Sequence, residues 1–412
     1  MNTRLPARFA LAAGALLIAG TAAAQVKIAY IDPLSGPFAN VGDAGLKHFQ
    51  SIVDQVNAKG GVLGGQKLEV VAFDNKGSPQ DSLISFKSVT DQGIRFITQG
   101  NGSGVAHALV DAVNKHNARN PDKTVLFLNY AAVDPELTNA KCSFWHFRFD
   151  ANSDMKMEAI TNYMAEDKKI KKVFIIGQDY AHGHQVARAA KAMLARKRPD
   201  IKIVGDDLHP IGKVKDFAPY VAKIKSSGAD TVITGNWGND LSLLVKAAKD
   251  AGLKVNFYTY YAGGLGTPTA MGEAGAGSVR QLTEWHANIA PNKTEQYAND
   301  FKKKYNNLDF YYLRINNEVN MLARAINEAR SADPKKVALA LEDMKFPADT
   351  GEVWMRRSDH QLIQPLYIST FTKVDGKAVK YDIEGTGYGF KTNVLVSARG
   401  SELPTGCIME RP

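Results

Sequence analysis

Cysteine is nearly absent from this chain of 412 residues, in which Cys142 and Cys407 are the only two. Zinc sites built from cysteine need ligands that are close together in the sequence, and two isolated cysteines do not supply them. In an oxidising compartment an even pair is typical of a disulfide. We therefore expect a Cys142–Cys407 bridge that ties the C-terminal tail to a much earlier segment. Two unpaired buried thiols remain the alternative.

Long apolar runs are also lacking outside the N-terminus. Residues 9–19 are apolar, Arg4 and Arg8 precede them, and the small residues 22–24 follow. This order is typical of a secretory signal peptide, here residues 1–24. The run is shorter than the roughly 20 residues that a membrane-spanning helix needs, which argues against a membrane anchor. No cysteine follows the predicted cleavage site, which argues against a lipid anchor, so we expect an exported chain.

The excess of positive charge is small. Lys and Arg number 51 against 42 Asp and Glu, which gives a formal net charge of +9. Basic residues gather in two short runs, at 168–172 and 196–198, and no nucleic-acid-binding motif accompanies them. We interpret both runs as solvated helix ends. The alternative, a patch for nucleic acid or for an anionic surface, is less consistent with an exported chain, and we expect no nucleic-acid partner.

The motifs of catalysis are lacking as well. The glycine-rich loop 100–104 lacks the lysine of a phosphate-binding loop and the spacing of a dinucleotide-binding fingerprint, and Ser35 lacks the glycine spacing of a nucleophile elbow. His182 and His184 stand two residues apart in a predicted loop, where we interpret them as surface polar residues rather than metal ligands. Carboxylates are dispersed along the chain. We expect no catalytic residue, no metal site and no cofactor.

What the sequence has instead is a regular alternation of apolar strands and helices. The opening unit, residues 26–79, is predicted as strand, helix and parallel strand, which is a βαβ unit. The same alternation starts again at Met155. A helical stretch over 295–330, broken near Asn306, has no partner in the second half and is expected to return to the first. We therefore predict an α/β protein of two Rossmann-like lobes joined as a clamshell.

The predicted division of the chain follows this alternation. The first lobe takes residues 25–149 and 286–358, the second lobe takes residues 150–285 and 359–395, and residues 396–412 form a tail that returns to the first lobe. No low-complexity linker separates the halves. The hinge is therefore expected to consist of several short crossings.

Strand ends supply the candidate ligand-binding residues, because ligands of open α/β sheets lie at the carboxyl ends of the strands. The loop over 35–43 is one candidate rim of the site. In the loop 100–104, free backbone N–H groups at a helix start favour an anion such as a ligand carboxylate, with the Ser103 hydroxyl beside them. The alternative is a plain turn with Ser103 as its N-cap. Three aromatic residues just past strands suit an organic ligand: Tyr180, Trp237 and Tyr261.

Several local patterns occur together, in order, behind the predicted signal peptide. They are SGP with GD in the loop 35–43, VNAKGGV at 56–62, DPELT at 134–138, DYAHG at 179–183 and a segment ending in AGL at 247–253. With these patterns, nearly the whole mature chain resembles periplasmic solute-binding proteins of the leucine/isoleucine/valine-binding type, the receptors of branched-chain amino acid ABC importers. The resemblance implies two Rossmann-like lobes of the type I periplasmic binding protein fold, three hinge crossings and closure around one small ligand.

The resemblance also implies which residues contact the ligand. The loop that holds the ligand carboxylate corresponds to Asn101, Gly102 and Ser103. The backbone stretch at the next strand end corresponds to Ala131 to Val133. The two aromatic residues of the pocket correspond to Tyr180 and Trp237.

Two positions depart from the amino-acid binders of this family. Where those proteins have an acidic residue for the ligand ammonium, this chain has Tyr261, and where they have a threonine hydroxyl for the same group, it has Val133. A buried ammonium without its anion is unfavourable. We therefore expect a carboxylate-bearing ligand that need not be an α-amino acid, such as an aromatic or apolar carboxylate, or an amide.

The function that the resemblance implies is that of a periplasmic receptor. It would bind a small molecule as a monomer and present its closed form to the membrane permease of an ABC importer. A ligand-sensing co-receptor for chemotaxis or signalling has the same ligand chemistry and stays as the alternative. An enzyme on the same scaffold is the least consistent with the lack of catalytic motifs.

Overall fold

The opening βαβ unit forms as the sequence predicts. In the computed structural model, which describes residues 25–412, β1 (Val26–Asp32) runs parallel to β2 (Leu68–Asp74), and α1 (Ala39–Ala58) connects them. Gly42 lies where α1 passes the end of β1. A side chain at this position would place its Cβ 1.7 Å from the Pro33 carbonyl oxygen. Glycine therefore lets the helix start directly against the strand.

The first lobe is built on an eight-stranded sheet in the order β11-β12-β13-β5-β4-β3-β1-β2. The early part of the chain supplies the parallel strands β3 (Phe96–Gln99), β4 (Leu126–Asn129) and β5 (His146–Arg148), with helices α2 (Pro79–Asp91) and α3 (Ser103–Arg119) between them. The late part supplies α9 (Glu295–Lys304), α10 (Leu313–Ala329), α11 (Pro334–Leu341), β11 (Lys345–Ala348), β12 (Gly351–Arg356) and β13 (Gln361–Ile363).

The predicted helical stretch over 295–330 divides where the sequence indicated. Asn306 and Asn307 both adopt positive φ, 52° and 66°, which ends α9 and separates it from α10. Helix α10 packs on α1, as expected for a return to the first lobe. Ahead of α10 the Tyr311 backbone N–H donates to Nε2 of the buried His48 at 2.9 Å.

The second lobe repeats the plan around a seven-stranded sheet in the order β15-β14-β10-β9-β8-β6-β7. Its first part contains α4 (Ser153–Glu166), β6 (Lys172–Gln178), α5 (Ala181–Lys197), β7 (Lys202–His209), α6 (Ala218–Ser227), β8 (Thr231–Thr234), α7 (Gly238–Asp250) and β9 (Asn256–Thr259). It is completed by α8 (Thr267–Met271), β10 (Val279–Thr283), β14 (Leu366–Lys373) and β15 (Tyr388–Val396).

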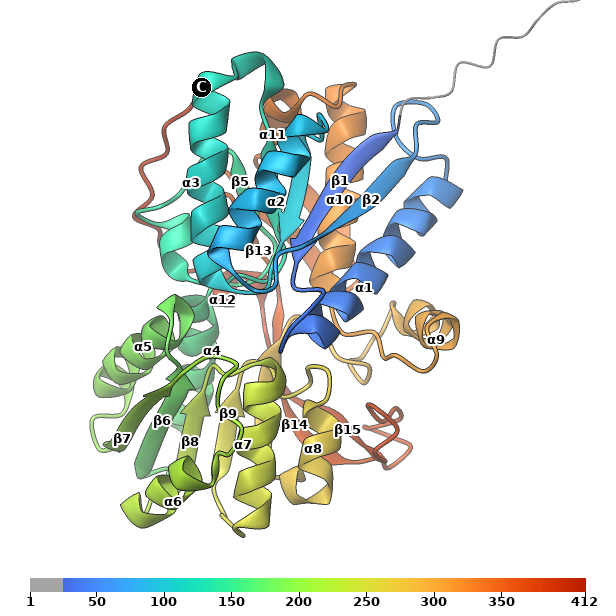
Figure 1. Cartoon of the computed structure of the whole chain (residues 1–412). Helices are drawn as coiled ribbons and strands as arrows, with labels where there is room; N and C mark the ends of the chain where they lie inside the picture. Colours follow the sequence, from blue (N-terminus) through green and yellow to red (C-terminus); the bar gives the residue numbers. More distant parts are fainter. Residues whose placement is uncertain (1–24) are drawn as a thin grey trace, which may run out of the picture.

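The chain passes between the two sheets three times (Figure 1). The passages follow β5, β10 and β13. The expected boundary at 358–359 falls too early, because β13 pairs with β5 in the first sheet and the passage to β14 comes after Ile363. Gln361 fixes this pairing, since its side chain accepts from Arg148 Nε at 2.8 Å and donates to the Asp150 carbonyl at 2.7 Å.

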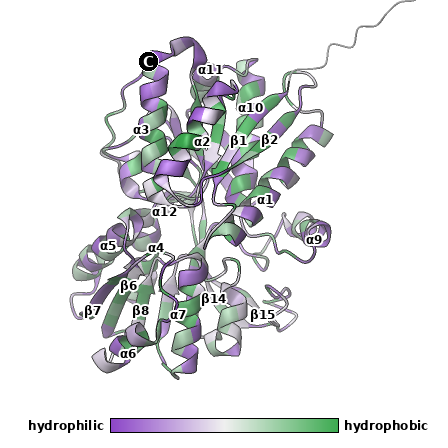
Figure 2. Cartoon of the chain, in the orientation of Figure 1, coloured by the Kyte–Doolittle hydropathy of each residue, from purple (hydrophilic) through white to green (hydrophobic). Residues whose placement is uncertain are grey.

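The apolar side chains form one core in the first lobe and two in the second, one on each face of the second sheet. In Figure 2 the sheet strands are mostly hydrophobic and the outer helix faces hydrophilic. Strands β3 and β4 are buried along their whole length, as expected for central parallel strands that helices cover on both faces. The cores leave the strand ends of both sheets facing each other.

The basic run at 196–198 is only partly a solvated helix end, because Arg196 is exposed but Arg198 is buried. Arg198 is 5% exposed, and its guanidinium donates to the carbonyls of Met164, Asp167 and Ile170 and pairs with Asp200 at 2.7 Å. It therefore fixes the end of α4 to the end of α5. The sequence around the run does not indicate this, because the three carbonyls lie about 30 residues earlier, at the end of α4 and in the segment that follows it.

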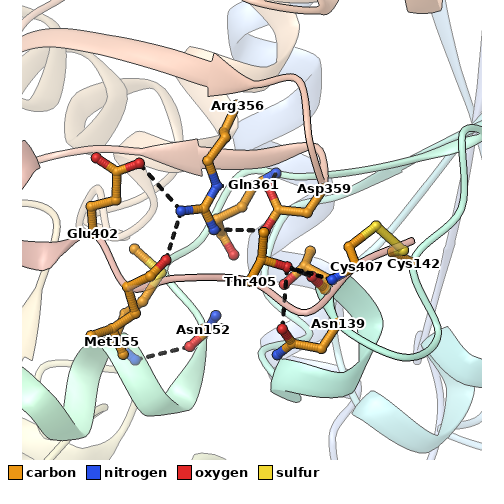
Figure 3. Close-up of polar contacts among 12 residues, drawn as sticks. Asn139, Cys142, Asn152, Met155, Arg356, Asp359, Gln361, Glu402, Thr405 and Cys407 are labelled. Carbon is orange, nitrogen blue, oxygen red and sulfur yellow. Dashed lines mark hydrogen bonds and ion pairs between the residues drawn. A yellow bond between two sulfur atoms is a disulfide. The ribbon is translucent and has the colours of Figure 1, made fainter. Parts of the chain in front are cut away.

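The C-terminal tail crosses back from the second lobe and is bonded to the first (Figure 3). Cys142 and Cys407, which are 265 positions apart in sequence, form a disulfide with Cα atoms 5.8 Å apart, which confirms the expected bridge. Beside it, Thr405 Oγ1 donates to the Thr138 carbonyl at 2.7 Å, and the Gly406 N–H donates to Asn139 Oδ1 at 2.9 Å. The tail is thus a covalent and hydrogen-bonded strap.

The predicted signal peptide, residues 1–24, lies outside the described residues. Among the helices of residues 25–412, none combines the length and the apolar character needed to cross a membrane.

Removing the disulfide should destabilise the protein. We expect the double variant C142S/C407S to lose on the order of 2–5 kcal/mol of unfolding free energy, because the unfolded chain regains the freedom of a long loop. Thermal unfolding followed by circular dichroism measures this, and the wild type under reducing conditions should match the variant. An unchanged unfolding midpoint would show that the strap holds through its hydrogen bonds alone.

Candidate ligand-binding site

All eight residues predicted to contact a ligand lie around one cavity between the two lobes, which we call the inner cavity. About 60 Å³ of it is open to the centre of a water-sized sphere, and it lies in the crevice between two lobes, where small-molecule sites commonly occur. The eight are Asn101, Gly102, Ser103, Ala131, Val133, Tyr180, Trp237 and Tyr261. They come from the ends of β3 and β4 in the first sheet and of β6, β8 and β9 in the second. The structure therefore brings together residues up to 160 positions apart.

The start of α3 forms the first-lobe wall of the inner cavity. Gly102 is the N-cap residue with a φ of 101°, a conformation that side chains disfavour, and no side chain caps the helix. The first-turn N–H groups of such a helix carry partial positive charge and suit an anion. Ser103 is not the N-cap that the alternative interpretation required, since it is the first residue of the helix itself.

The buried carboxylate of Asp32 holds this loop from below. It accepts from the Asn101 N–H at 2.9 Å, from the Gly100 N–H at 3.2 Å and from the Tyr130 hydroxyl at 2.8 Å. Burial raises the pKa of Asp32 to about 7, and these three hydrogen bonds partly oppose the rise. Two backbone N–H groups of the loop are therefore used inside the protein, which leaves those of the first α3 turn for a ligand.

The segment after β4 is shaped by its own asparagine. Asn129 Oδ1 accepts from the Ala132 N–H at 2.7 Å, and its Nδ2 donates to the Ala132 carbonyl at 2.9 Å. This turn carries Val133 against the inner cavity, where it presents an apolar side chain that is 2% exposed. Ser103 Oγ accepts from the Asp134 N–H at 3.3 Å, so the Ser103 hydroxyl proton is free to point elsewhere.

Two aromatic residues form the second-lobe wall. Tyr180 is the N-cap residue of α5 and Trp237 that of α7, and neither helix has a side-chain cap. Trp237 Nε1 donates to the Tyr180 hydroxyl oxygen at 2.8 Å. Burial raises the pKa of Tyr180 above its usual value, so the hydroxyl keeps its proton and acts as a donor.

The two walls touch through aromatic packing. The Phe38 ring of the first lobe lies 4.3 Å, centroid to centroid, from the Trp237 ring of the second. Asn239 Nδ2 donates to the Pro37 carbonyl at 2.9 Å. Of the candidate rim over 35–43, Val41 lines the inner cavity, while Pro37 and Phe38 meet the opposite lobe. The clamshell is therefore closed.

The interpretation of the two histidines as surface residues is right for His184 and wrong for His182. Helix α5 begins at Ala181, so both histidines lie in the helix rather than in a loop. His184 is on the surface and pairs with Asp179 at 2.8 Å, but His182 is 1% exposed and lines the inner cavity. Burial lowers the pKa of His182 to about 4, and its Nε2 lies 3.2 Å from the Gly235 carbonyl, so it is a neutral donor to that carbonyl. No group of three or more potential metal ligands occurs within residues 25–412.

Sequence reasoning missed the contribution of α10. Tyr312 and Arg314 line the inner cavity, although they lie in the stretch that returns to the first lobe. Arg314 is buried and pairs with Glu284, Nη1 to Oε1, at 2.9 Å. Burial alone would raise the pKa of Glu284, but the charges of Arg314 and Lys156 outweigh it and hold that pKa below its usual value. No local sequence signal marks Arg314, because its partner comes from another passage of the chain.

The inner cavity is lined by donors and contains no acid. None of the described residues that line it is Asp or Glu, and its one charged side chain is Arg314. Tyr261 occupies the position after β9 and lies under Lys156, whose Nζ is 4.9 Å from the ring centre. Carboxylates near the cavity are already paired: Asp150 with Lys156 at 2.8 Å, and Glu284 with Arg314. The geometry therefore suits an anionic group and offers no counter-ion for an ammonium.

Two Rossmann-like lobes closed over a cavity at their strand ends define a clamshell protein that binds a small molecule. The chain belongs to the periplasmic binding protein family, whose model matches residues 25–377, and within it to the Leu/Ile/Val-binding type.

Curated relatives of this type match over most of the chain. The chain is 33% identical over 434 residues to Leu/Ile/Val-binding protein homolog 4 of Brucella abortus (strain 2308), with 100% of each chain covered. It is 28% identical over 334 residues to the leucine-, isoleucine-, valine-, threonine- and alanine-binding protein of Pseudomonas aeruginosa, covering 81% of this chain and 86% of that one.

Solved structures show the same fold. The closed conformation of the leucine-, isoleucine-, valine-, threonine- and alanine-binding protein of Brucella ovis superposes with a TM-score of 0.83 at 32% identity, covering 95% of this chain and 100% of that one. A solute-binding protein of Rhodopseudomonas palustris, solved with benzoate, has a TM-score of 0.78 at 18% identity, covering 93% and 100%. The second likeness concerns the fold alone.

Helix α10 carries another buried carboxyl, that of Glu318. Glu318 is 1% exposed, and its Oε1 accepts from Thr98 Oγ1 at 2.7 Å, while its Oε2 has no partner among the described residues. Burial raises the pKa of Glu318 to about 8. In the unfolded chain this carboxyl has an ordinary pKa near 4, so the folded state holds the proton over a wider pH range. The stability contribution of neutral Glu318 is complete below about pH 4 and is lost as the pH rises toward 8.

The variant E318Q should remove this pH dependence. The wild type should lose stability between pH 5 and pH 9 as Glu318 loses its proton, whereas glutamine needs no proton to be neutral. We therefore expect the difference in unfolding free energy, E318Q minus wild type, to increase by on the order of 1–3 kcal/mol over this range. Urea unfolding at a series of pH values measures it. The exposed Glu328 on the same helix, replaced by glutamine, serves as the control. A difference between E318Q and wild type that stays constant with pH would contradict the assignment.

Proposed function

We propose that this protein is the extracytoplasmic receptor of an ABC importer, and that it binds a small carboxylate-bearing ligand that need not carry an α-ammonium group. The observation that carries the proposal is the lining of the inner cavity. It has the uncapped start of α3, the hydroxyls of Ser103 and Tyr180 and the guanidinium of Arg314, and no Asp or Glu among the described residues. An aromatic or apolar carboxylate satisfies these donors, and Val133 and Tyr261 cover its body.

Closure is the mechanism that follows from the two walls. Donors from α3 and Arg314 belong to the first lobe, whereas Tyr180 and Trp237 belong to the second. A ligand between them contacts both lobes only in the closed form, so its binding free energy favours closure. The closed lobes form the joint surface that a membrane permease would recognise.

The family supports the remaining parts of the proposal. Its members are periplasmic, which fits an export signal at residues 1–24, and its role in import implies permease subunits as partners. We propose that the receptor acts as a monomer, because one chain supplies both walls of the inner cavity. A branched-chain amino acid is the second candidate ligand, favoured by the whole-length similarity to Leu/Ile/Val-binding protein homolog 4.

Calorimetry on ligand-free protein separates the two ligand classes. We expect benzoate and 4-hydroxybenzoate to bind and benzamide to bind at least tenfold more weakly, because the amide brings no negative charge to the α3 start and Arg314. Leucine and valine should bind weakly, because the inner cavity offers their ammonium no anion. Tight binding of leucine or valine, together with no heat from the aromatic acids, would contradict the proposed ligand class.

Ligand binding should change the fluorescence of Trp237. The ring lies at the inner cavity and packs against Phe38, so both the ligand and closure alter its surroundings. We expect the variant W237F to lose most of the ligand-induced signal at concentrations where calorimetry shows saturation. The variant W145F, whose tryptophan lies in the first-lobe core, should keep it. Full retention of the signal in W237F would contradict this placement.

A further inference from the structure

A second cavity adjoins the inner one, and we call it the outer chamber. It is larger than the inner cavity, because about 120 Å³ of it is open to the centre of a water-sized sphere, against about 60 Å³ of the inner cavity. Its walls are the end of β9, the chain after β10, helix α9 and the loop before β15. Four residues line both spaces: Tyr261, Gly264, Tyr312 and Arg314. The two spaces are therefore neighbours that share one partition.

The outer chamber is walled by aromatic rings. Residues from four separate parts of the chain supply them: Tyr260, Trp285, Phe310, Tyr311, Tyr381 and Phe390. Most of these side chains are themselves buried, so the rings are held in place by packing. Aromatic walls offer a large apolar surface to an organic group.

The polar groups around the outer chamber form hydrogen bonds with one another. Trp285 Nε1 donates to Asn292 Oδ1 at 3.2 Å. Asn288 Oδ1 accepts from the backbone N–H groups of Lys380 at 2.9 Å and Tyr381 at 2.8 Å. Because of these hydrogen bonds, the side-chain amides of Asn288 and Asn292 have little capacity left to bind a ligand.

The charged groups of the outer chamber are paired in the same way. Lys302 Nζ lies 2.7 Å from Asp309 Oδ1, and the Tyr381 hydroxyl donates to Glu295. Asp309 Oδ2 also accepts from the Glu384 N–H at 2.6 Å. The outer chamber therefore suits an apolar or aromatic group rather than a charged one.

We propose that the outer chamber is a second subsite, which takes the apolar or aromatic tail of an elongated monocarboxylate whose carboxylate lies in the inner cavity. This inference rests on the proposed function, because it places the carboxylate at the α3 start. Such a ligand would cross the partition formed by the four shared residues. The class of ligand is then an aryl-alkanoate or a molecule of similar length, larger than a free branched-chain amino acid.

A series of phenyl-substituted acids tests the subsite by calorimetry. The probes are benzoate, 3-phenylpropanoate, 5-phenylpentanoate and 7-phenylheptanoate. Each methylene that enters an apolar chamber should tighten binding about threefold to fourfold. We expect 5-phenylpentanoate to bind at least tenfold more tightly than benzoate. An affinity that does not rise along the series would overturn the subsite while leaving the proposed function intact, provided that benzoate binds.

The variant A298W fills the outer chamber from one side. Ala298 lies on α9, lines the outer chamber and does not line the inner cavity. We expect A298W to remove the gain of 5-phenylpentanoate over benzoate and to change the affinity for benzoate less than twofold. The matched control is K303W, which puts the same side chain on an exposed position of α9 that lines neither space. It should leave the whole series unchanged.

The outcomes separate the two claims. Loss of the length gain in A298W but not in K303W supports the subsite. An equal length gain in wild type and A298W would overturn it, because the tail would then lie elsewhere. If A298W does not fold, A298F gives the same comparison with a smaller ring. No heat from any acid of the series would overturn both the subsite and the proposed carboxylate ligand.

Discussion

Four buried charges at the passages between the lobes fix the geometry on which the site depends. Lys156 of α4 pairs with Asp150 at 2.8 Å, and Arg314 of α10 pairs with Glu284 at 2.9 Å. Asp150 follows β5 and Glu284 follows β10, so each acid sits on a passage and each base on a helix of a lobe. Removing one partner would leave a buried charge unpaired, which is strongly unfavourable. The pairs therefore fix the position of each passage relative to the helices that carry the ligand-binding residues.

This arrangement also determines what the inner cavity can accept. Asp150 and Glu284 are paired at the hinge, while the guanidinium of Arg314 still reaches the wall of the cavity. The uncapped helix starts then add partial positive charge from both lobes. A carboxylate gains from all of these groups at once, whereas an ammonium would have no anion to meet. The family provides the clamshell, and we propose that the pairing at the hinge gives the inner cavity its preference for carboxylates.

The sequence predicts what local patterns determine. The strand–helix alternation, the break at Asn306 and the strand-end residues such as Ser103 and Tyr180 follow from turn chemistry and from the rule that ligands lie at strand ends. His182 was misplaced because α5 begins at Ala181, ahead of both histidines that were expected in a loop. Arg314 and the outer chamber depend on contacts between distant passages of the chain, which no local pattern encodes. The short strands β11 to β13 were missed for the same reason.

The central claim is that a carboxylate closes the two lobes over the inner cavity. Small-angle X-ray scattering on ligand-free protein tests it most directly, because closure of a clamshell reduces the radius of gyration. The account predicts a smaller radius of gyration at saturation with a bound aromatic carboxylate, and no change with the matched amide at the same concentration. A carboxylate that calorimetry shows to be bound, but that leaves the radius of gyration unchanged, would contradict it.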